Sequence, residues 1–328
     1  MKVKFLLKKC FHAIFAFAAT TMSAEVHHYV FFGMDREQIT NAEFLDTKAF
    51  EGAQLKYSWR QLEHQKDQYD FADIKRDLAF LKSKDKKLFI QLGDSSFSPD
   101  RVPVPRYLME DPRFHGGANN QFDIDNDDQD HARIQGWVAR RWDPAVQERL
   151  HKLLFALGRE FDGKIEGINL SETAVDIPLT GKLCPLGFTA ETYRDAVLTN
   201  MTILKRAFPH SVAMQYANFM PGDVSYLQSV YRAAEELNVA VGGPDLLPYR
   251  PFQMANSYPL IREASGKIPI GIAAQDGNYE SKNPKTGQQI TVTEMIEFAT
   301  GYLKVNYIFW CTQEPFFSQN LLPVLKAK

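Results

Sequence analysis

The sequence of 328 residues contains little that would indicate a disulfide framework, a nucleotide site or a nucleic-acid partner. Of its three cysteines, Cys184 and Cys311 are widely separated, so we expect free thiols. No glycine-rich phosphate-binding motif follows the first apolar segment of the mature chain, which disfavours a nucleotide site. The formal net charge is only −2, which indicates neither nucleic acid nor an anionic membrane as a partner.

Long hydrophobic runs are also missing. The apolar run Cys10–Ala19 has about half the length that spans a bilayer. Lysines precede it, and small residues follow it up to Ala24, which is the order typical of a secretory signal peptide. We therefore expect residues 1–24 to be a signal peptide and residues 25–328 to be one exported domain, periplasmic or secreted, with no integral membrane segment. The alternative is a membrane-associated helix that stays attached.

What the sequence does contain is a regular alternation of strand-like and helix-like segments. Eight short apolar segments are rich in β-branched and aromatic residues and predict strands. They are His28–Met34, Ala53–Trp59, Lys87–Gly93, Lys164–Leu170, Val212–Ala217, Val239–Gly243, Ile268–Ala274 and Val305–Trp310. Helical patterns lie between them, with Asp143 and Thr189 at expected N-caps. Eight such units predict a parallel (β/α)₈ TIM barrel, and an open doubly wound sheet is the alternative.

One connection is unusually long. About 50 residues, Asp94 to Asp143, follow the third predicted strand, and connections of that length are usually functional or mobile. We expect this segment to form a wall of the site, with Trp137 or Trp142 facing the cleft. Its acidic run, residues 123–130, lacks the glycine and the later glutamate of an EF-hand, so a solvated loop is expected rather than a calcium site.

The active site of such a barrel forms where the strand C-termini meet the following loops. Carboxylates, amides, one arginine and aromatic rings are expected there: Trp59, Arg60, Gln91, Asn169, Glu172, Tyr216, Asn218, Asp245, Gln275, Asp276, Trp310 and Glu314. No histidine follows a predicted strand, so we expect no zinc site and no other metal or cofactor. This set suits an oligosaccharide or polysaccharide, because two carboxyl groups cleave a glycosidic bond and amides reach sugar hydroxyls.

The segment Tyr57–Phe71 resembles a motif at strand 2 of clan A glycoside hydrolases, especially β-galactosidase-like members. In that motif a Trp is followed by Glu-Pro and then by Gly-x-Tyr-Asp-Phe. The residues that match are Trp59, Glu63, Tyr69, Asp70 and Phe71, and those that depart are His64 and Asp67. The segments Gly167–Glu172 and Tyr307–Trp310 extend the resemblance to strands 4 and 8.

The resemblance implies a glycoside hydrolase with an acid/base Glu after strand 4 and a nucleophilic Glu after strand 7. Glu172 matches the first position, although Ser171 rather than Asn precedes it. Gln275 falls at the second position, and a neutral amide cannot form the glycosyl ester of a retaining enzyme. Asp276 is therefore the first choice for the second catalytic carboxylate and Glu314 the second choice, with Asp245 and Glu280 as further candidates.

The prediction is thus a glycoside hydrolase of the retaining type, with Glu172 as general acid/base. The remaining rim residues are expected to bind the substrate: Trp59, Arg60, Gln91, Asn169, Tyr216, Asn218, Asp245, Gln275 and Trp310. Two alternatives stay open. Gln275 favours a non-catalytic carbohydrate-binding barrel that has lost its nucleophile, and a barrel can also support unrelated chemistry.

Overall fold

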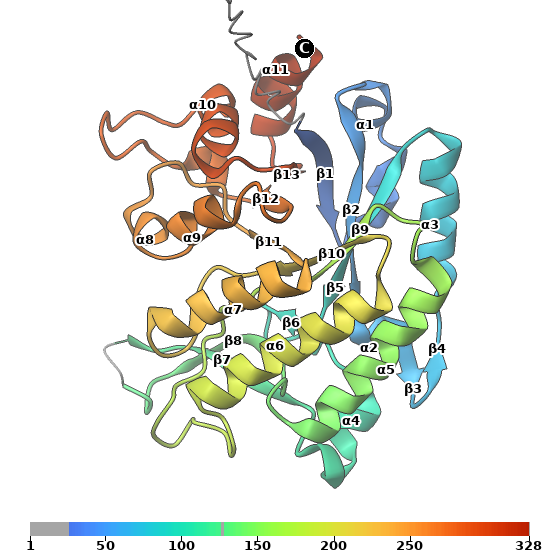
Figure 1. The fold of residues 1–328 in the computed structure, drawn as a ribbon, viewed down its shortest axis with the longest axis vertical. Helices are drawn as coiled ribbons and strands as arrows, with labels where there is room; N and C mark the ends of the chain where they lie inside the picture. Colours follow the sequence, from blue (N-terminus) through green and yellow to red (C-terminus); the bar gives the residue numbers. More distant parts are fainter. Residues whose placement is uncertain (1–25, 126–127, 328) are drawn as a thin grey trace, which may run out of the picture.

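The computed structural model describes residues 26–125 and 128–327, so the predicted signal peptide lies outside the described residues. The described chain forms a closed barrel of parallel strands in the order β1-β13-β12-β11-β10-β9-β5-β2 (Figure 1). The predicted barrel is confirmed, and the open doubly wound sheet is excluded. Among the described residues, no helix combines the length and apolar character needed to cross a membrane.

All eight predicted strands form the barrel, each within a few residues of its expected position. They are β1 (His27–Gly33), β2 (Phe50–Ser58), β5 (Lys87–Gly93), β9 (Gly167–Leu170), β10 (Val212–Tyr216), β11 (Ala240–Gly243), β12 (Ile270–Ala274) and β13 (Tyr307–Cys311). The longer helices that surround the barrel are α3 (Ala72–Ser83), α5 (Pro144–Phe161), α6 (Ala190–Ala207), α7 (Val224–Leu237) and α9 (Ser257–Ala264).

Shorter elements complete the chain. The short helices are α1 (Ala42–Asp46), α2 (Trp59–Leu62), α4 (Arg106–Glu110), α8 (Pro251–Ala255), α10 (Val292–Glu297) and α11 (Leu322–Lys326). The 3-10 turns are η1 (Arg36–Thr40), η2 (Pro112–Phe114) and η4 (Asn278–Glu280), and the π-helical turns are η5 (Phe298–Leu303) and η6 (Phe317–Leu321). A small hairpin, β3 (Glu63–Gln65) and β4 (Gln68–Tyr69), follows α2.

The two expected N-caps are both formed. The carboxylate of Asp143 accepts hydrogen bonds from the backbone amides of Ala145 and Val146 at the start of α5. Thr189 and Thr192 form a capping box at the start of α6. Each side chain satisfies backbone N–H groups that the first helical turn leaves without an intrahelical acceptor.

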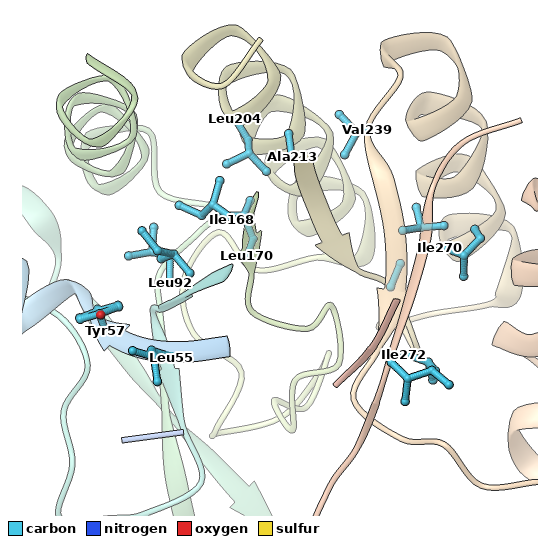
Figure 2. Close-up of a cluster of buried hydrophobic side chains, with 14 of the residues drawn as sticks. Leu55, Tyr57, Leu92, Ile168, Leu170, Leu204, Ala213, Val239, Ile270 and Ile272 are labelled. Carbon is cyan, nitrogen blue, oxygen red and sulfur yellow. The ribbon is translucent and has the colours of Figure 1, made fainter. Parts of the chain in front are cut away.

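Each barrel strand has two faces with different environments. Outward-facing side chains such as Leu55, Ile168 and Ala213 pack under the helices in the main core, and Figure 2 shows Ile168 and Ala213 beside Leu204 of α6. A second buried cluster, which includes Tyr29 and Phe89, is formed by residues of the opposite parity and fills the barrel interior. Because parity alternates along a strand, Gln54 and Lys56 of β2 face the interior while Leu55 faces the helices.

The long connection after β5 is folded. Its strands β6 (Ser95–Ser96), β7 (Ala118–Asp123) and β8 (Arg133–Ala139) form an antiparallel sheet in the order β6-β8-β7. Trp142 does not face a cleft: it is 7% exposed and packs against Phe188 and Tyr193. In the acidic run, Asp123 pairs with Arg133 and Asp130 pairs with Lys182 on the surface. Cys184 and Cys311 are free thiols, as expected.

The motif at the end of β2 forms a buried polar cluster that ties this connection to the barrel. The carboxylate of Glu63 is fully buried and accepts hydrogen bonds from Trp59 Nε1 at 2.8 Å and from the Tyr107 hydroxyl at 3.1 Å. Arg149 of α5 donates to it at 2.5 Å. Trp59 is itself fully buried, so the predicted contact between Trp59 and a sugar is corrected to a structural role.

We expect Glu63→Gln to destabilise the fold by about 3 kcal/mol, because it leaves the buried Arg149 without its buried counterion. The matched control is Asp67→Asn, since Asp67 pairs with the same Arg149 but its side chain is 55% exposed. That control should cost less than about 1 kcal/mol. Urea unfolding of both variants measures the difference, and equal losses would contradict the assignment of Glu63 as the main partner of Arg149.

Candidate active site

A pocket opens at the C-terminal end of the barrel. It encloses about 500 Å³, part of it open to solvent. Its lining comes from inward-facing strand residues and from the loops that follow the strands: Phe31, Lys56, Gln91, Ser95, Phe97, Ser171, Glu172, Tyr216, Pro244 and Gln275. Four of the predicted site residues, Gln91, Glu172, Tyr216 and Gln275, are therefore brought together. The long connection forms one wall through Ser95 and Phe97, whereas Trp137 and Trp142 are not among the lining residues.

Glu172 is held from two sides. Its carboxylate accepts a hydrogen bond of 2.6 Å from the Asn218 side-chain amide, at the end of β10. Its backbone carbonyl accepts a hydrogen bond of 2.9 Å from Arg141. The same guanidinium forms a bidentate pair with Asp94, with both N–O distances at 2.7 Å. The turn that carries Glu172 is thus fixed by a buried ion pair, and its carboxylate is directed by an amide.

The electrostatics of the pocket favour the protonated form of Glu172. Burial raises the pKa of Glu172 to about 7. The hydrogen bond from Asn218 works against this shift, and the negative charge of Asp245 adds to it. The positive charges of Arg141 and Lys56 lower the pKa again by smaller amounts. Near neutral pH, a large fraction of Glu172 therefore carries a proton that it can donate.

Asp245 is the acidic neighbour whose charge acts on Glu172. It follows β11, next to Pro244 of the pocket wall, and its carboxylate accepts a hydrogen bond of 3.1 Å from the Asn278 amide. Burial raises the pKa of Asp245 as well. Asp276, the first choice from the sequence, is exposed and lies beside Cys311, where its carboxylate adds to the effect of burial in raising the pKa of that thiol to about 12.

Several predicted site residues lie outside the pocket. Trp310 is fully buried and donates a hydrogen bond of 3.0 Å to His28, so the predicted sugar contact of Trp310 is corrected to core packing. Asn169 is fully buried within the barrel and accepts from Gln54 at 3.0 Å. Arg60 donates to the Val102 carbonyl. The exposed carboxylate of Glu314 accepts from Ser318, one turn ahead.

Lys56, Phe31, Ser95 and Phe97 line the pocket but were not predicted from the sequence. The signal for Lys56 was present in the pattern of β2, where Gln54, Lys56 and Ser58 alternate with Leu55 and Tyr57. Period-two alternation within a central barrel strand indicates a polar inner face. No comparable pattern marks Phe97, which is 60% exposed on the loop after β5. Among the described residues, no group of three or more His, Cys, Asp or Glu is placed to hold a metal ion.

The sequence matches no protein-family model and no curated protein. The structure is similar to xylanase 10B from Thermotoga petrophila RKU-1, with 9% identity, a TM-score of 0.52 and coverage of 87% of this chain and 82% of that one. It is also similar to the β-galactosidase from Bacillus circulans sp. alkalophilus, with 10% identity, a TM-score of 0.57 and coverage of 88% of this chain and 50% of that one.

A third similar structure is the β-galactosidase from the haloarchaeon Halorubrum lacusprofundi, with 12% identity, a TM-score of 0.53 and coverage of 87% of this chain and 52% of that one. The fold shared with these three structures is the closed (β/α)₈ barrel. The resemblance inferred from the strand 2 motif is thereby confirmed at the level of fold. The chain spans about half the length of the two β-galactosidases, and the likeness at this identity extends to the barrel and not to individual residues.

The pKa of Glu172 should respond to its neighbours with opposite signs. Asp245→Asn removes a negative charge and should lower it, whereas Asn218→Ala removes a hydrogen bond to the carboxylate and should raise it. Carbon-13 NMR titration of glutamate side chains, with Glu172→Gln to assign the resonance, measures both shifts. Asp276→Asn is the matched control and should leave the pKa of Glu172 unchanged. A larger shift in Asp276→Asn than in Asp245→Asn would overturn the assignment of Asp245 as the interacting carboxylate.

Proposed function

We propose that this protein is a glycoside hydrolase acting on an oligosaccharide or polysaccharide, with Glu172 as the general acid. The observation that carries the proposal is a partly buried carboxyl group in the mouth of the barrel, with a pKa of about 7. A general acid must hold its proton at the start of the reaction and release it in the transition state, and a pKa near the working pH serves both. The fold shared with a xylanase and two β-galactosidases supports a sugar substrate.

The proposed reaction begins with donation of the Glu172 proton to the leaving glycosidic oxygen. Asn218 directs the carboxylate, and Gln91 lines the pocket within reach of sugar hydroxyls, whereas the Tyr216 hydroxyl is buried and accepts from Gln54. Gln275 cannot act as a nucleophile, so we propose Asp245 as the second carboxyl group. Its position after β11 and its electrostatic coupling to Glu172 support this choice over Asp276 and Glu314, which are both exposed. The anomeric form of the first product, read by proton NMR, reports retention or inversion.

The second candidate function is a carbohydrate-binding barrel without hydrolytic activity. The presence of Gln275 in the pocket favours it, because the resemblance implies a nucleophilic Glu after strand 7 and Gln275, which follows that strand, is a neutral amide. One measurement separates the two candidates, namely product release from a sugar that binds. A carbohydrate-binding barrel binds the sugar but releases no product.

Glu172→Gln keeps the shape of the side chain and removes its proton, so it should lower turnover by about 10²–10⁴-fold. The measurement is hydrolysis of a panel of chromogenic glycosides and polysaccharides by the purified protein of residues 25–328. Glu280→Gln is the matched control, because Glu280 is exposed on the loop after β12 and is not a lining residue. Full activity of Glu172→Gln on a substrate that the wild type cleaves would reject Glu172 as the acid. Sugar binding without any product would favour the binding barrel.

The pH dependence of hydrolysis should follow the proton on Glu172. Because the acid form is required, the alkaline limb should fall roughly tenfold per pH unit above a pH of about 7, whereas an acidic limb would report the ionisation of Asp245. If Asp245→Asn retains measurable turnover, its alkaline limb should move to lower pH, because the carboxylate that raises the pKa of Glu172 is gone. A profile of kcat/KM against pH for both proteins measures this, and an unmoved limb would contradict the coupling.

We further propose that residues 1–24 direct export. The proposal rests on the order of lysines, apolar residues and small residues in the sequence. N-terminal sequencing of the protein recovered from its host would test cleavage after Ala24, and an intact Met1 would reject it.

A further inference from the structure

Lys56 is an unusual residue for the inner face of a barrel strand. It lies on β2 beside Gln91 of β5, its register partner, and its side chain lines the pocket. The aliphatic stem passes over Gly93, where an added Cβ would stand 2.9 Å from Lys56 Cε. A larger residue at position 93 would therefore displace the lysine. Lys56 forms no ion pair or hydrogen bond with another residue of the ranges 26–125 and 128–327.

The surrounding charges leave Lys56 without a counterion. Asp94 acts on Lys56, but its carboxylate is occupied by the bidentate pair with Arg141. Glu172 also acts on it, yet near neutral pH a large fraction of Glu172 is uncharged. Arg101, on the long connection, adds a second positive charge. Burial lowers the pKa of Lys56 because these neighbours do not offset the lost hydration.

The side chains of two amides that line the same pocket as Lys56 also lack partners. The side chain of Gln91 is 8% exposed, and its Oε1 accepts no hydrogen bond from any described residue. The side-chain amide of Gln275, across the pocket, likewise forms no hydrogen bond within the described ranges. A buried polar atom without a partner is rare in folded proteins, and Gln91 Oε1 is one; with the unpartnered side chains of Lys56 and Gln275, which are partly exposed in the same pocket, it indicates a polar ligand.

We propose that the pocket binds an acidic sugar residue, with its carboxylate or sulfate group on Lys56 and its hydroxyls on Gln91 and Gln275. An anion on Lys56 supplies the counterion that the protein itself does not, and a charge-assisted hydrogen bond in a partly buried site is stronger than a neutral one. Hydroxyl groups satisfy the free amide atoms on either side. The inference rests on the proposed function in taking a sugar as the ligand, but it requires binding and not hydrolysis.

The test is isothermal titration calorimetry of the purified protein at pH 6, where Glu172 is mostly protonated. The probes are methyl β-D-glucuronide, galactose 6-sulfate and the neutral methyl β-D-glucoside. We expect at least one acidic sugar to bind about tenfold or more tightly than the neutral one, a difference of about 1.4 kcal/mol. Lys56→Met, which keeps the length of the side chain and removes its charge, should abolish that preference.

Lys285→Met is the matched control, because it removes the same charge from an exposed position on the loop after β12 and should keep the preference. Lys56→Gln, read with the same probes, guards against misfolding of the methionine variant. Equal affinity of the wild type for acidic and neutral sugars, or an undiminished preference in a folded Lys56 variant, would overturn the proposal. Failure of the proposed hydrolysis would look different: the sugar would bind, but no product would be released.

Discussion

The buried pair of Asp94 and Arg141 is the interaction on which the geometry of the pocket depends. It joins the end of β5 to the segment before α5, and the remaining donors of Arg141 bind the Glu172 carbonyl and the Tyr193 hydroxyl. Burial alone would raise the pKa of Asp94, but the charge and hydrogen bonds of Arg141 hold it below its ordinary value. In a fully hydrogen-bonded buried pair, the attraction between the charges offsets the free-energy cost of removing them from water. Either charge buried alone would strongly destabilise the fold. Because both carboxylate oxygens of Asp94 bind Arg141, Asp94 is not available as a counterion for Lys56. The ion pair that fixes the Glu172 turn therefore leaves Lys56 without a counterion.

The strand 2 motif has a different role from the one its position suggests. Trp59 and Glu63 lie at the C-terminal end of a barrel strand, where catalytic residues are common. Their side chains instead point into the protein, where the Glu63 carboxylate accepts hydrogen bonds from Trp59, Tyr107 and Arg149. These contacts anchor α4 of the long connection and the helix α5 that follows it, and the same connection contributes Ser95 and Phe97 to the pocket. The motif therefore indicates the fold and supports the wall of the site, and it carries no information about the reaction.

The fold and the position of Glu172 could be predicted from the sequence because both follow from local patterns. Period-two apolar strands with capped helices between them specify the barrel, and the barrel places Glu172 at its mouth. The predicted sugar contact of Trp310 is wrong because residues near a strand end can lie on either face of the strand. Trp310 faces the helices and belongs to the main core, whereas its neighbour Phe309 belongs to the cluster that fills the barrel interior. The coupling of Asp245 to Glu172 depends on loop conformations between different strands, which no periodicity encodes.

The charge of the pocket links the proposed hydrolysis to the proposed ligand. Glycosidic cleavage passes through a transition state that resembles an oxocarbenium ion, and two carboxyl groups normally stabilise its positive charge. Here Gln275 supplies no charge and Lys56 supplies one of the wrong sign. A positive charge close to the developing oxocarbenium ion opposes it and raises the barrier. An acidic group on the substrate that pairs with Lys56 removes most of this penalty, whereas a neutral sugar does not. The same lysine that attracts an acidic sugar would therefore make hydrolysis selective for it, because the ligand itself completes the electrostatics of the site.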